Sequence, residues 1–229
     1  ALVFGVAAAG YLTLVGLQAA LDEIFTPNQT QWLVVQEPGS FGEVYGSVLA
    51  PQAGDRLREL GAAQVIPVIH AITGTSRKDT RLVQGVALGE YTQTNTFRLL
   101  SGRALQVGDA PRAAMLGWRL AQKLALEPGD AILLRGRSFI VVGVFRTGTF
   151  SDNEAWIPLE SAQALLGLGE QVSIYLVPDD GAFEPGAYLP GGLEVVRQGY
   201  SILGGKQQYQ PMLDMFRAVT MALGIAAAL

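Results

Sequence analysis

Two apolar segments without a charged side chain lie at the two ends of the chain. Ala1–Leu21 would form a helix about 31 Å long at 1.5 Å per residue, which matches the hydrocarbon core of a bilayer. Ala218–Leu229 would reach only about 18 Å, roughly half of that thickness. We therefore predict a transmembrane helix over residues 1–21 and the start of a second one over residues 218–229. We also expect the chain to be a fragment of a longer protein.

Two other interpretations of Ala1–Leu21 remain open, a buried helix of a soluble core and a cleaved signal peptide. A buried helix of this length would normally carry a polar stripe, and a signal peptide would have a basic region before a shorter apolar run. The segment shows neither feature, since its few polar side chains are Tyr11, Thr13 and Gln18.

The distribution of charges predicts the orientation in the membrane. The first basic residue of the whole chain is Arg56, and it is preceded by Asp22, Glu23, Glu37 and Glu43. Basic residues collect on the cytoplasmic flanks of membrane helices. We therefore expect residues 22–205 to be extracytoplasmic, in a protein of the plasma (inner) membrane.

A helical pattern leads back toward the membrane. Met212, Met215 and Phe216 follow the i, i+3, i+4 spacing of one helix face, and Pro211 is compatible with a first turn or a kink. We predict a stalk helix over residues 206–217.

Between the two ends, short apolar runs separated by Gly and Pro predict an α+β domain. The expected strands are Trp32–Gln36, Val65–Ile72, Leu82–Leu88, Ala113–Leu116, Ala131–Leu134, Ser138–Phe145, Glu154–Pro158, Val172–Val177 and Leu193–Arg197. The expected helices are Ala53–Leu60, Trp118–Leu126 and Leu159–Leu166. Pro67 argues for an edge strand or a bulge. Ser138–Phe145 is apolar at both parities, which predicts burial on both faces.

Charge and composition exclude several classes of function. The 16 Lys and Arg are outnumbered by 20 Asp and Glu, which disfavours nucleic-acid binding. The chain has no cysteine, so disulfides, zinc–thiolate sites, iron–sulfur ligation and a cysteine nucleophile are excluded.

No motif predicts a catalytic, cofactor-binding or metal-binding residue. The only histidine, His70, lies in an apolar run and is expected in the core or at a strand edge. Asp152 with Glu154, and Asp179 with Asp180, are expected to be solvated turn residues. The remaining fragments of known motifs are incomplete or match by chance, namely Gly204-Gly205-Lys206, Gly167-Leu168-Gly169 and Asn28-Gln29-Thr30.

Several short motifs in a fixed order resemble the extracytoplasmic core domain of MacB/FtsX-type ABC-transporter permeases. They are Ser101-Gly102-Arg103, Ala113–Gly117, Leu120–Leu124, Pro128-Gly129-Asp130, Arg137–Phe145, Asp152–Leu159 and Ala162–Gly167. The resemblance covers residues 101–177 well and the flanks by layout only. The order of membrane helix, external domain, stalk and second membrane helix agrees with it independently.

The resemblance implies a porter-like α/β sandwich part with a small β-rich part inserted into it. We would place the insert near residues 101–166, with residues 26–95 and 172–199 in the porter-like part. It also implies four membrane helices in the full permease, a second permease subunit in a homo- or heterodimer, and a cytoplasmic ABC ATPase subunit. An extracytoplasmic adaptor protein is an optional further partner.

The function implied is a non-catalytic permease segment that couples cytoplasmic ATP hydrolysis to extracytoplasmic movement, or mechanotransmission, for export or extraction of a substrate. Two alternatives from other classes remain. One is a membrane-anchored binding module or enzyme, which would need ionisable groups such as His70 to converge in a polar pocket. The other is an adhesion module with a single anchor.

Overall fold

The computed structural model describes residues 13, 15–16, 32–40, 45–74, 79–109, 111–186, 188–196, 214–215, 218–219 and 221. The predicted transmembrane helix at 1–21, the stalk helix at 206–217 and the start of a second span at 218–229 therefore lie almost entirely outside the described residues. Within the described residues, no helix combines the length and the apolar character needed to cross a bilayer.

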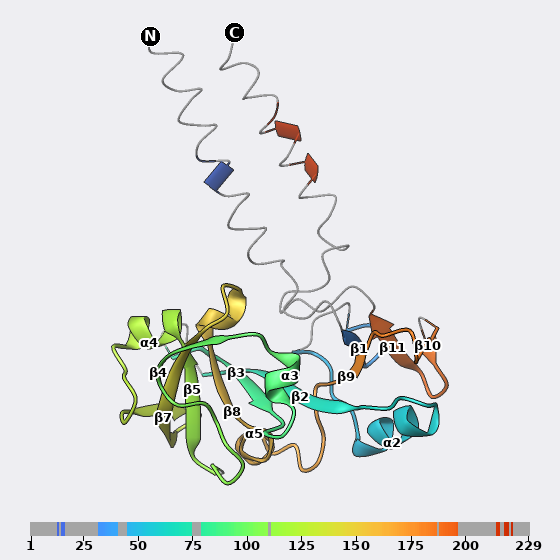
Figure 1. Ribbon diagram of the computed structural model, residues 1–229, viewed down its shortest axis with the longest axis horizontal. Coiled ribbons are helices and arrows are strands. Elements are labelled where there is room, and N and C mark those ends of the chain that lie inside the picture. Colours follow the sequence, from blue (N-terminus) through green and yellow to red (C-terminus); the bar gives the residue numbers. More distant parts are fainter. Residues whose placement is uncertain are drawn as a thin grey trace.

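One mixed β-sheet runs through the described domain (Figure 1). Its strand order is β10-β11-β1-β9-β2-β3-β8-β5-β7-β4, and β6 pairs with β7 beside this path. The strands are β1 Trp32–Gln36, β2 Ile66–Thr73, β3 Arg81–Val86, β4 Arg98–Gly102, β5 Ala113–Gly117, β6 Ala131–Leu134, β7 Arg137–Arg146, β8 Glu154–Pro158, β9 Ile174–Pro178, β10 Tyr188–Leu189 and β11 Leu193–Val196. The pairs β3–β8 and β5–β7 are parallel, and the other pairs are antiparallel.

Two helices of the described domain cover one face of this sheet. The described helices are α2 Pro51–Glu59, α3 Tyr91–Thr94, α4 Trp118–Leu124 and α5 Leu159–Leu166, with a 3-10 turn at Phe150–Asn153. The largest core cluster includes Leu57 of α2 and Ala162 of α5. α5 packs on β2, β3 and β8, and both α2 and α5 lie below the sheet in Figure 1.

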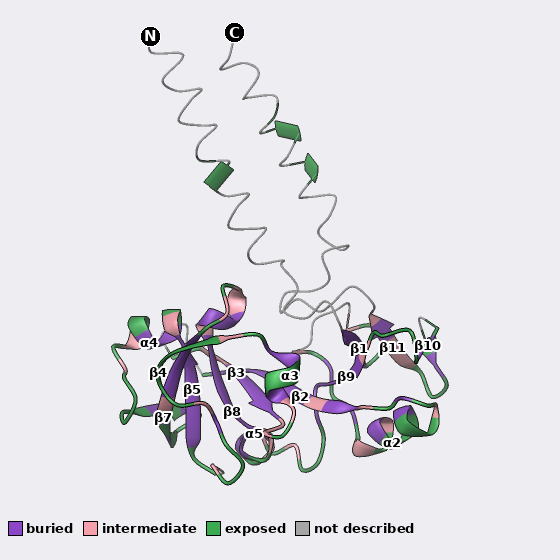
Figure 2. Cartoon of the chain, in the orientation of Figure 1, coloured by how far each residue is buried: buried purple, intermediate pink, exposed green. Residues whose placement is uncertain are grey.

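The opposite face carries two further apolar clusters. One consists of Trp32, Val34, Ile66, Val68, Ile174 and Leu176 from β1, β2 and β9. The other contains Tyr91 of α3 together with Met115, Phe145 and Trp156. Buried residues consequently follow the central strands on both sides, as Figure 2 shows, so a strand in the middle of the sheet has no solvated face.

The expected strands and helices are found, with boundaries within a few residues, and the α+β fold class is confirmed. The motif Pro128-Gly129-Asp130 lies in a turn at residues 127–130, in which the Asp130 amide donates to the Glu127 carbonyl at 3.0 Å. Gly129 lies in it with a φ of +104°, a value that glycine adopts without steric cost.

Two local expectations were wrong. β2 is not an edge strand, because it pairs with both β9 and β3. Pro67 lies in the first part of β2, where only β9 is paired, so its missing N–H leaves the β3 ladder intact. β7 is buried on both faces only in its second half, since Ile140 in its first half is 47% exposed.

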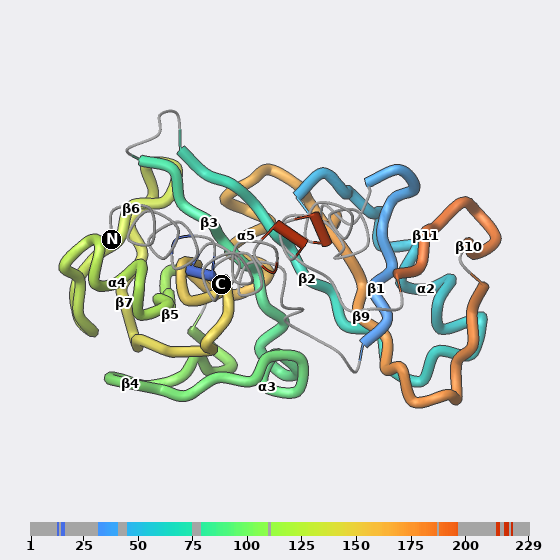
Figure 3. Tube along the Cα trace, turned by 90° about the horizontal axis from the view of Figure 1, so that it is seen from above, coloured from blue at the N-terminus to red at the C-terminus, as the bar shows by residue number. Residues whose placement is uncertain are grey.

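The predicted insert at residues 101–166 shares the sheet with the predicted porter-like part. β8 and α5 fall inside that range, yet β8 pairs with β3 and α5 packs on β2 and β3. Seen from above, the β4–β7 strands and the β1–β10–β11 strands lie at opposite ends of the domain (Figure 3). The division at residues 101 and 166 stays a prediction.

Candidate functional site

A cluster of polar side chains lies buried in the middle of the sheet. It consists of His70 on β2, Gln84 on β3, and Glu154 and Trp156 on β8, and we call it the polar cluster. His70 is opposite Gln84 in the antiparallel β2–β3 register, and Gln84 is opposite Trp156 in the parallel β3–β8 register. Facing pairs share one side of a sheet, so the four side chains gather on one face.

That face is the one opposite α5. A Cβ added at Gly85 would lie 2.6 Å from the Cβ of Ala162 in α5 and 3.1 Å from the Cβ of Ile69. Ile69 and Gly85 therefore face the helix, and because side chains alternate along a strand, His70 and Gln84 point to the other side. No side chain of the cluster exceeds 3% exposure.

Burial keeps His70 uncharged near neutral pH and brings the titration of Glu154 into the neutral range. The loss of solvation lowers the pKa of His70 to about 3 and raises the pKa of Glu154 to about 7. The Trp156 indole donates to Glu154 Oε2 at 3.0 Å, which opposes the rise. His70 Nδ1 lies 4.0 Å from Glu154 Oε1, too far for a hydrogen bond.

The backbone of His70 is hydrogen-bonded to Ser173, the residue directly before β9. The His70 amide donates to Ser173 Oγ at 3.0 Å, and the Ser173 hydroxyl donates to the His70 carbonyl at 3.2 Å. The ring of Tyr45 meets the imidazole edge-on at a centroid distance of 5.7 Å. These contacts hold the imidazole in one place.

Gln84 is the member of the cluster that sequence reasoning missed. Neither its Oε1 nor its Nε2 has a hydrogen-bond partner within the described part of the chain, although both atoms are buried. Leaving a buried polar group unpaired costs about 1–3 kcal/mol. The signal was a single polar residue within the apolar run Leu82–Leu88.

Asp152 and Glu154 are not the solvated turn residues that we expected. Asp152 is 1% exposed and Glu154 is fully buried. Asp152 accepts hydrogen bonds from Trp118 Nε1 at 2.7 Å, from the Thr147 amide at 2.6 Å and from the Thr147 hydroxyl at 2.9 Å. The carboxylate thereby joins α4 to the turn that precedes β8. The sequence could not show this, because the donors come from up to 34 residues away.

The other sequence candidates have ordinary structural places. Asp179 and Asp180 are exposed, as expected. Gly167 ends α5 with a φ of 72°, the usual left-handed helix C-cap. Residues 28–30 and 204–206 lie outside the described residues. Within the described residues, no group of three or more His, Asp or Glu could hold a metal ion.

The polar cluster can hold or release a proton, but in this conformation a solute has no path to it because all four side chains are buried. What the geometry provides is a set of buried polar groups from β2, β3 and β8 at the centre of the sheet. The architecture is that of a mixed α/β domain. Its first and last described strands, β1 and β11, are neighbours in the sheet.

Comparison with known proteins identifies the family. A family model for the MacB-like periplasmic core domain matches residues 1–184. This match spans well over half of the chain, and the chain therefore belongs to that family, whose members are domains of ABC-transporter permeases. No curated protein matches the chain.

One solved structure supports the fold, and a second has a lower TM-score. The periplasmic region of MacB from Actinobacillus actinomycetemcomitans superposes with a TM-score of 0.51 at 17% identity, over 66% of this chain and 76% of that chain. The extracellular domain of the noncanonic ABC-type transporter YknZ from Gram-positive bacteria gives a TM-score of 0.49 at 17% identity, over 66% of this chain and 84% of that chain. The family match confirms the resemblance predicted from the sequence, and the domain is the periplasmic or extracellular part of an ABC permease.

Proposed function

We propose that the chain is the segment of an ABC-transporter permease that converts cytoplasmic ATP hydrolysis into movement of the extracytoplasmic domain, for export or extraction of a substrate. The observation that carries the proposal is the family match, which includes the uncharged segment 1–21 together with the external domain. In this proposal the permease is a multi-pass protein of the plasma (inner) membrane that works with an ABC ATPase subunit and a second permease subunit.

The arrangement of β1 and β11 supports transmission of movement into the sheet. The two strands are antiparallel neighbours, with Val34 opposite Val196 and Gln36 opposite Glu194. The beginning of β1 therefore lies beside the end of β11. Gln36 Nε2 also donates to Glu194 Oε2 at 3.0 Å. A displacement that arrives through either flanking segment would act on the same pair of strands.

Burial makes β1 a stiff point of entry for such a displacement. All five residues of β1 are buried, and β1 pairs with β9 as well as with β11. Close-packed interiors transmit strain instead of absorbing it. Movement of β1 would pass to β9, then to β2 and the polar cluster.

The test uses the permease purified with its co-purifying ATPase subunit and reconstituted in lipid nanodiscs. Hydrogen exchange of β1, β9 and β11 is compared in the absence of nucleotide and in the presence of ATP with vanadate. We expect a nucleotide-dependent change in these strands. A flexible loop inserted between Gly204 and Gly205 should abolish that change while ATP hydrolysis continues.

The matched control is the same insertion after Gly181, in an exposed segment of the domain. It should leave the nucleotide-dependent change intact. A change that persists after the 204–205 insertion would contradict transmission through the predicted stalk, and absence of any nucleotide effect in the parent protein would contradict the proposed function itself.

A further inference from the structure

A pocket lies between α5 and the hairpin of β6 and β7. Its volume is about 410 Å³, and it receives side chains from three places, Arg112 before β5, Arg137 and Phe139 on β7, and Ser161 on α5. The pocket is separate from the polar cluster, because α5 covers the opposite face of the sheet.

Two positive charges share this pocket. Arg112 and Arg137 are both exposed, and neither forms an ion pair with an acidic side chain in the described residues. No acidic side chain lines the pocket. Two guanidinium groups around one cavity repel each other unless an anion lies between them, and the guanidinium fork matches the geometry of carboxylate and phosphate oxygens.

A buried hydroxyl adds a third polar group. Ser161 is 4% exposed and lines the pocket, and its Oγ has no hydrogen-bond partner in the described part of the chain. Ser161 is the third residue of α5, where serine often bonds to the backbone instead. A buried hydroxyl without a partner is costly, and an oxyanion in the pocket would supply the missing acceptor.

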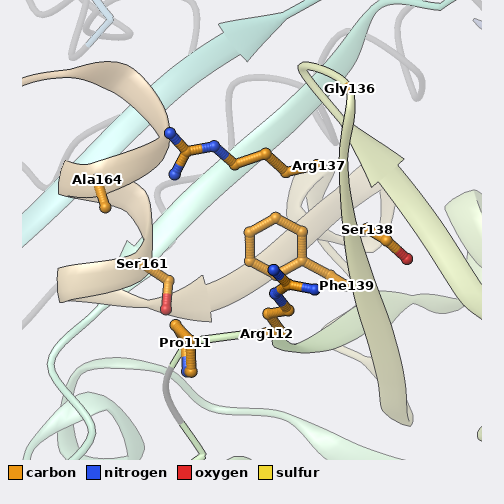
Figure 4. A pocket seen from close by; sticks show the side chains of 8 residues that line it. All are labelled: Pro111, Arg112, Gly136, Arg137, Ser138, Phe139, Ser161 and Ala164. Carbon is orange, nitrogen blue, oxygen red and sulfur yellow. The ribbon is translucent and has the colours of Figure 1, made fainter.

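The wall of the pocket is apolar on one side. Phe139 is 2% exposed, and its ring lies between the Arg112 and Arg137 side chains in Figure 4. Arg137 extends from the hairpin toward α5, which carries Ser161 and Ala164 (Figure 4). The Ile140 amide donates to the Arg112 carbonyl at 2.7 Å, so the backbone holds Arg112 beside the hairpin.

We propose that this pocket binds a small organic anion. Its carboxylate or phosphate group is held by the guanidinium groups of Arg112 and Arg137 and by the Ser161 hydroxyl, and its apolar part packs against Phe139. The bound anion bridges the β6–β7 hairpin and α5, a helix that packs on β2, β3 and β8. This inference does not depend on the proposed movement of the domain.

Titration calorimetry of the full chain in detergent micelles tests the proposal with three probes, phenyl phosphate, benzoate and inorganic phosphate. We expect an aromatic anion to bind more tightly than inorganic phosphate, because only the aromatic probes contact Phe139. The tighter of phenyl phosphate and benzoate identifies the preferred oxyanion. Benzylammonium, an aromatic cation of similar size, should not bind.

The variants separate a built site from general attraction of anions. Arg137→Gln and Ser161→Ala should each raise the dissociation constant of the tighter probe about ten-fold, the value of one hydrogen bond to a charged group. Arg135→Gln makes the same charge change in the same hairpin, outside the pocket, and should stay within about two-fold of the parent.

Two results would overturn the proposal. One is that none of the three anions binds the parent chain. The other is that Arg135→Gln weakens binding as much as Arg137→Gln, which would show attraction by net charge alone. Circular dichroism of each variant verifies that the fold is retained, which is expected because Arg135 and Arg137 are exposed.

Discussion

At the scale of single residues, His70 and Glu154 act on stability in opposite directions. Burial raises the pKa of Glu154 from 4.5 to about 7, so its contribution is complete below pH 4.5 and is lost as the pH rises to about 7. Burial lowers the pKa of His70 from 6.5 to about 3, so its contribution is complete above pH 6.5 and is lost as the pH falls to about 3. Between pH 4.5 and 6.5 the two effects cancel.

Removing one of the two groups should reveal the pH dependence of stability that the other group causes. In Glu154→Gln only the His70 effect remains, and the free energy of unfolding should rise with pH by about 1.4 kcal/mol per unit between pH 4.5 and 6.5. Urea unfolding of the full chain in detergent at several pH values within this range measures the slope. The parent chain and the exposed control Glu170→Gln should share one shallower profile. A slope in Glu154→Gln equal to that of the parent would contradict the assignment of the two protonation states.

At the scale of elements, one glycine sets the distance between α5 and the sheet. A Cβ at Gly85 would lie 2.6 Å from the Cβ of Ala162, closer than two non-bonded carbon atoms can approach. Gly85→Ala should therefore destabilise the domain by about 1–3 kcal/mol through overpacking. Gly89→Ala is the control, since its added Cβ meets nothing within 4 Å, and it should change stability by less than about 0.5 kcal/mol.

A second substitution tests whether the contact with Ala162 is the cause. Ala162→Gly alone should cost about 1 kcal/mol, because it places glycine inside a helix. In the double variant the methyl group moves from the helix to the strand, so the two losses should sum to at least about 1 kcal/mol more than the measured loss. If thermal or urea unfolding gives a loss in the double variant equal to the sum of the two single losses, the contact with Ala162 is not the cause of the destabilisation by Gly85→Ala.

The elements also show how much of the fold can be predicted from the sequence. Leu159–Leu166 was predicted with its observed bounds, because Pro158 and Gly167 mark both ends. β4 was missed because all five of its residues are exposed, so no apolar pattern marks it. The buried state of Asp152 was missed because charged side chains are rarely buried, and only the fold brings Trp118 to it. The pocket with Arg112 and Ser161 was missed for the same reason.

At the scale of the whole domain, the sheet has a narrow seam between β5 and β8. Only two residue pairs join these strands, Met115 with Trp156 and Leu116 with Ala155. Across the seam, the ring of Trp156 stacks on Phe145 of β7 at a centroid distance of 3.9 Å. Trp156 thus links the β4–β7 strands to the rest of the sheet through its side chain.

A cavity on one side of this seam should lower the hydrogen-exchange protection mainly of the strands on that side. Trp156→Ala removes the stack and should cost about 3–5 kcal/mol, while Leu57→Ala opens a cavity of similar cost, about 2–5 kcal/mol, under α2. If the seam divides the domain into two cooperative units, Trp156→Ala should reduce the hydrogen-exchange protection of β5 and β7 more than that of β1 and β9, and Leu57→Ala should do the reverse. Trp156→Phe keeps an aromatic ring against Phe145 and should lose less protection than Trp156→Ala. Equal loss across all strands in both alanine variants would instead show one unit, in which a displacement of β1 reaches β7 without a hinge.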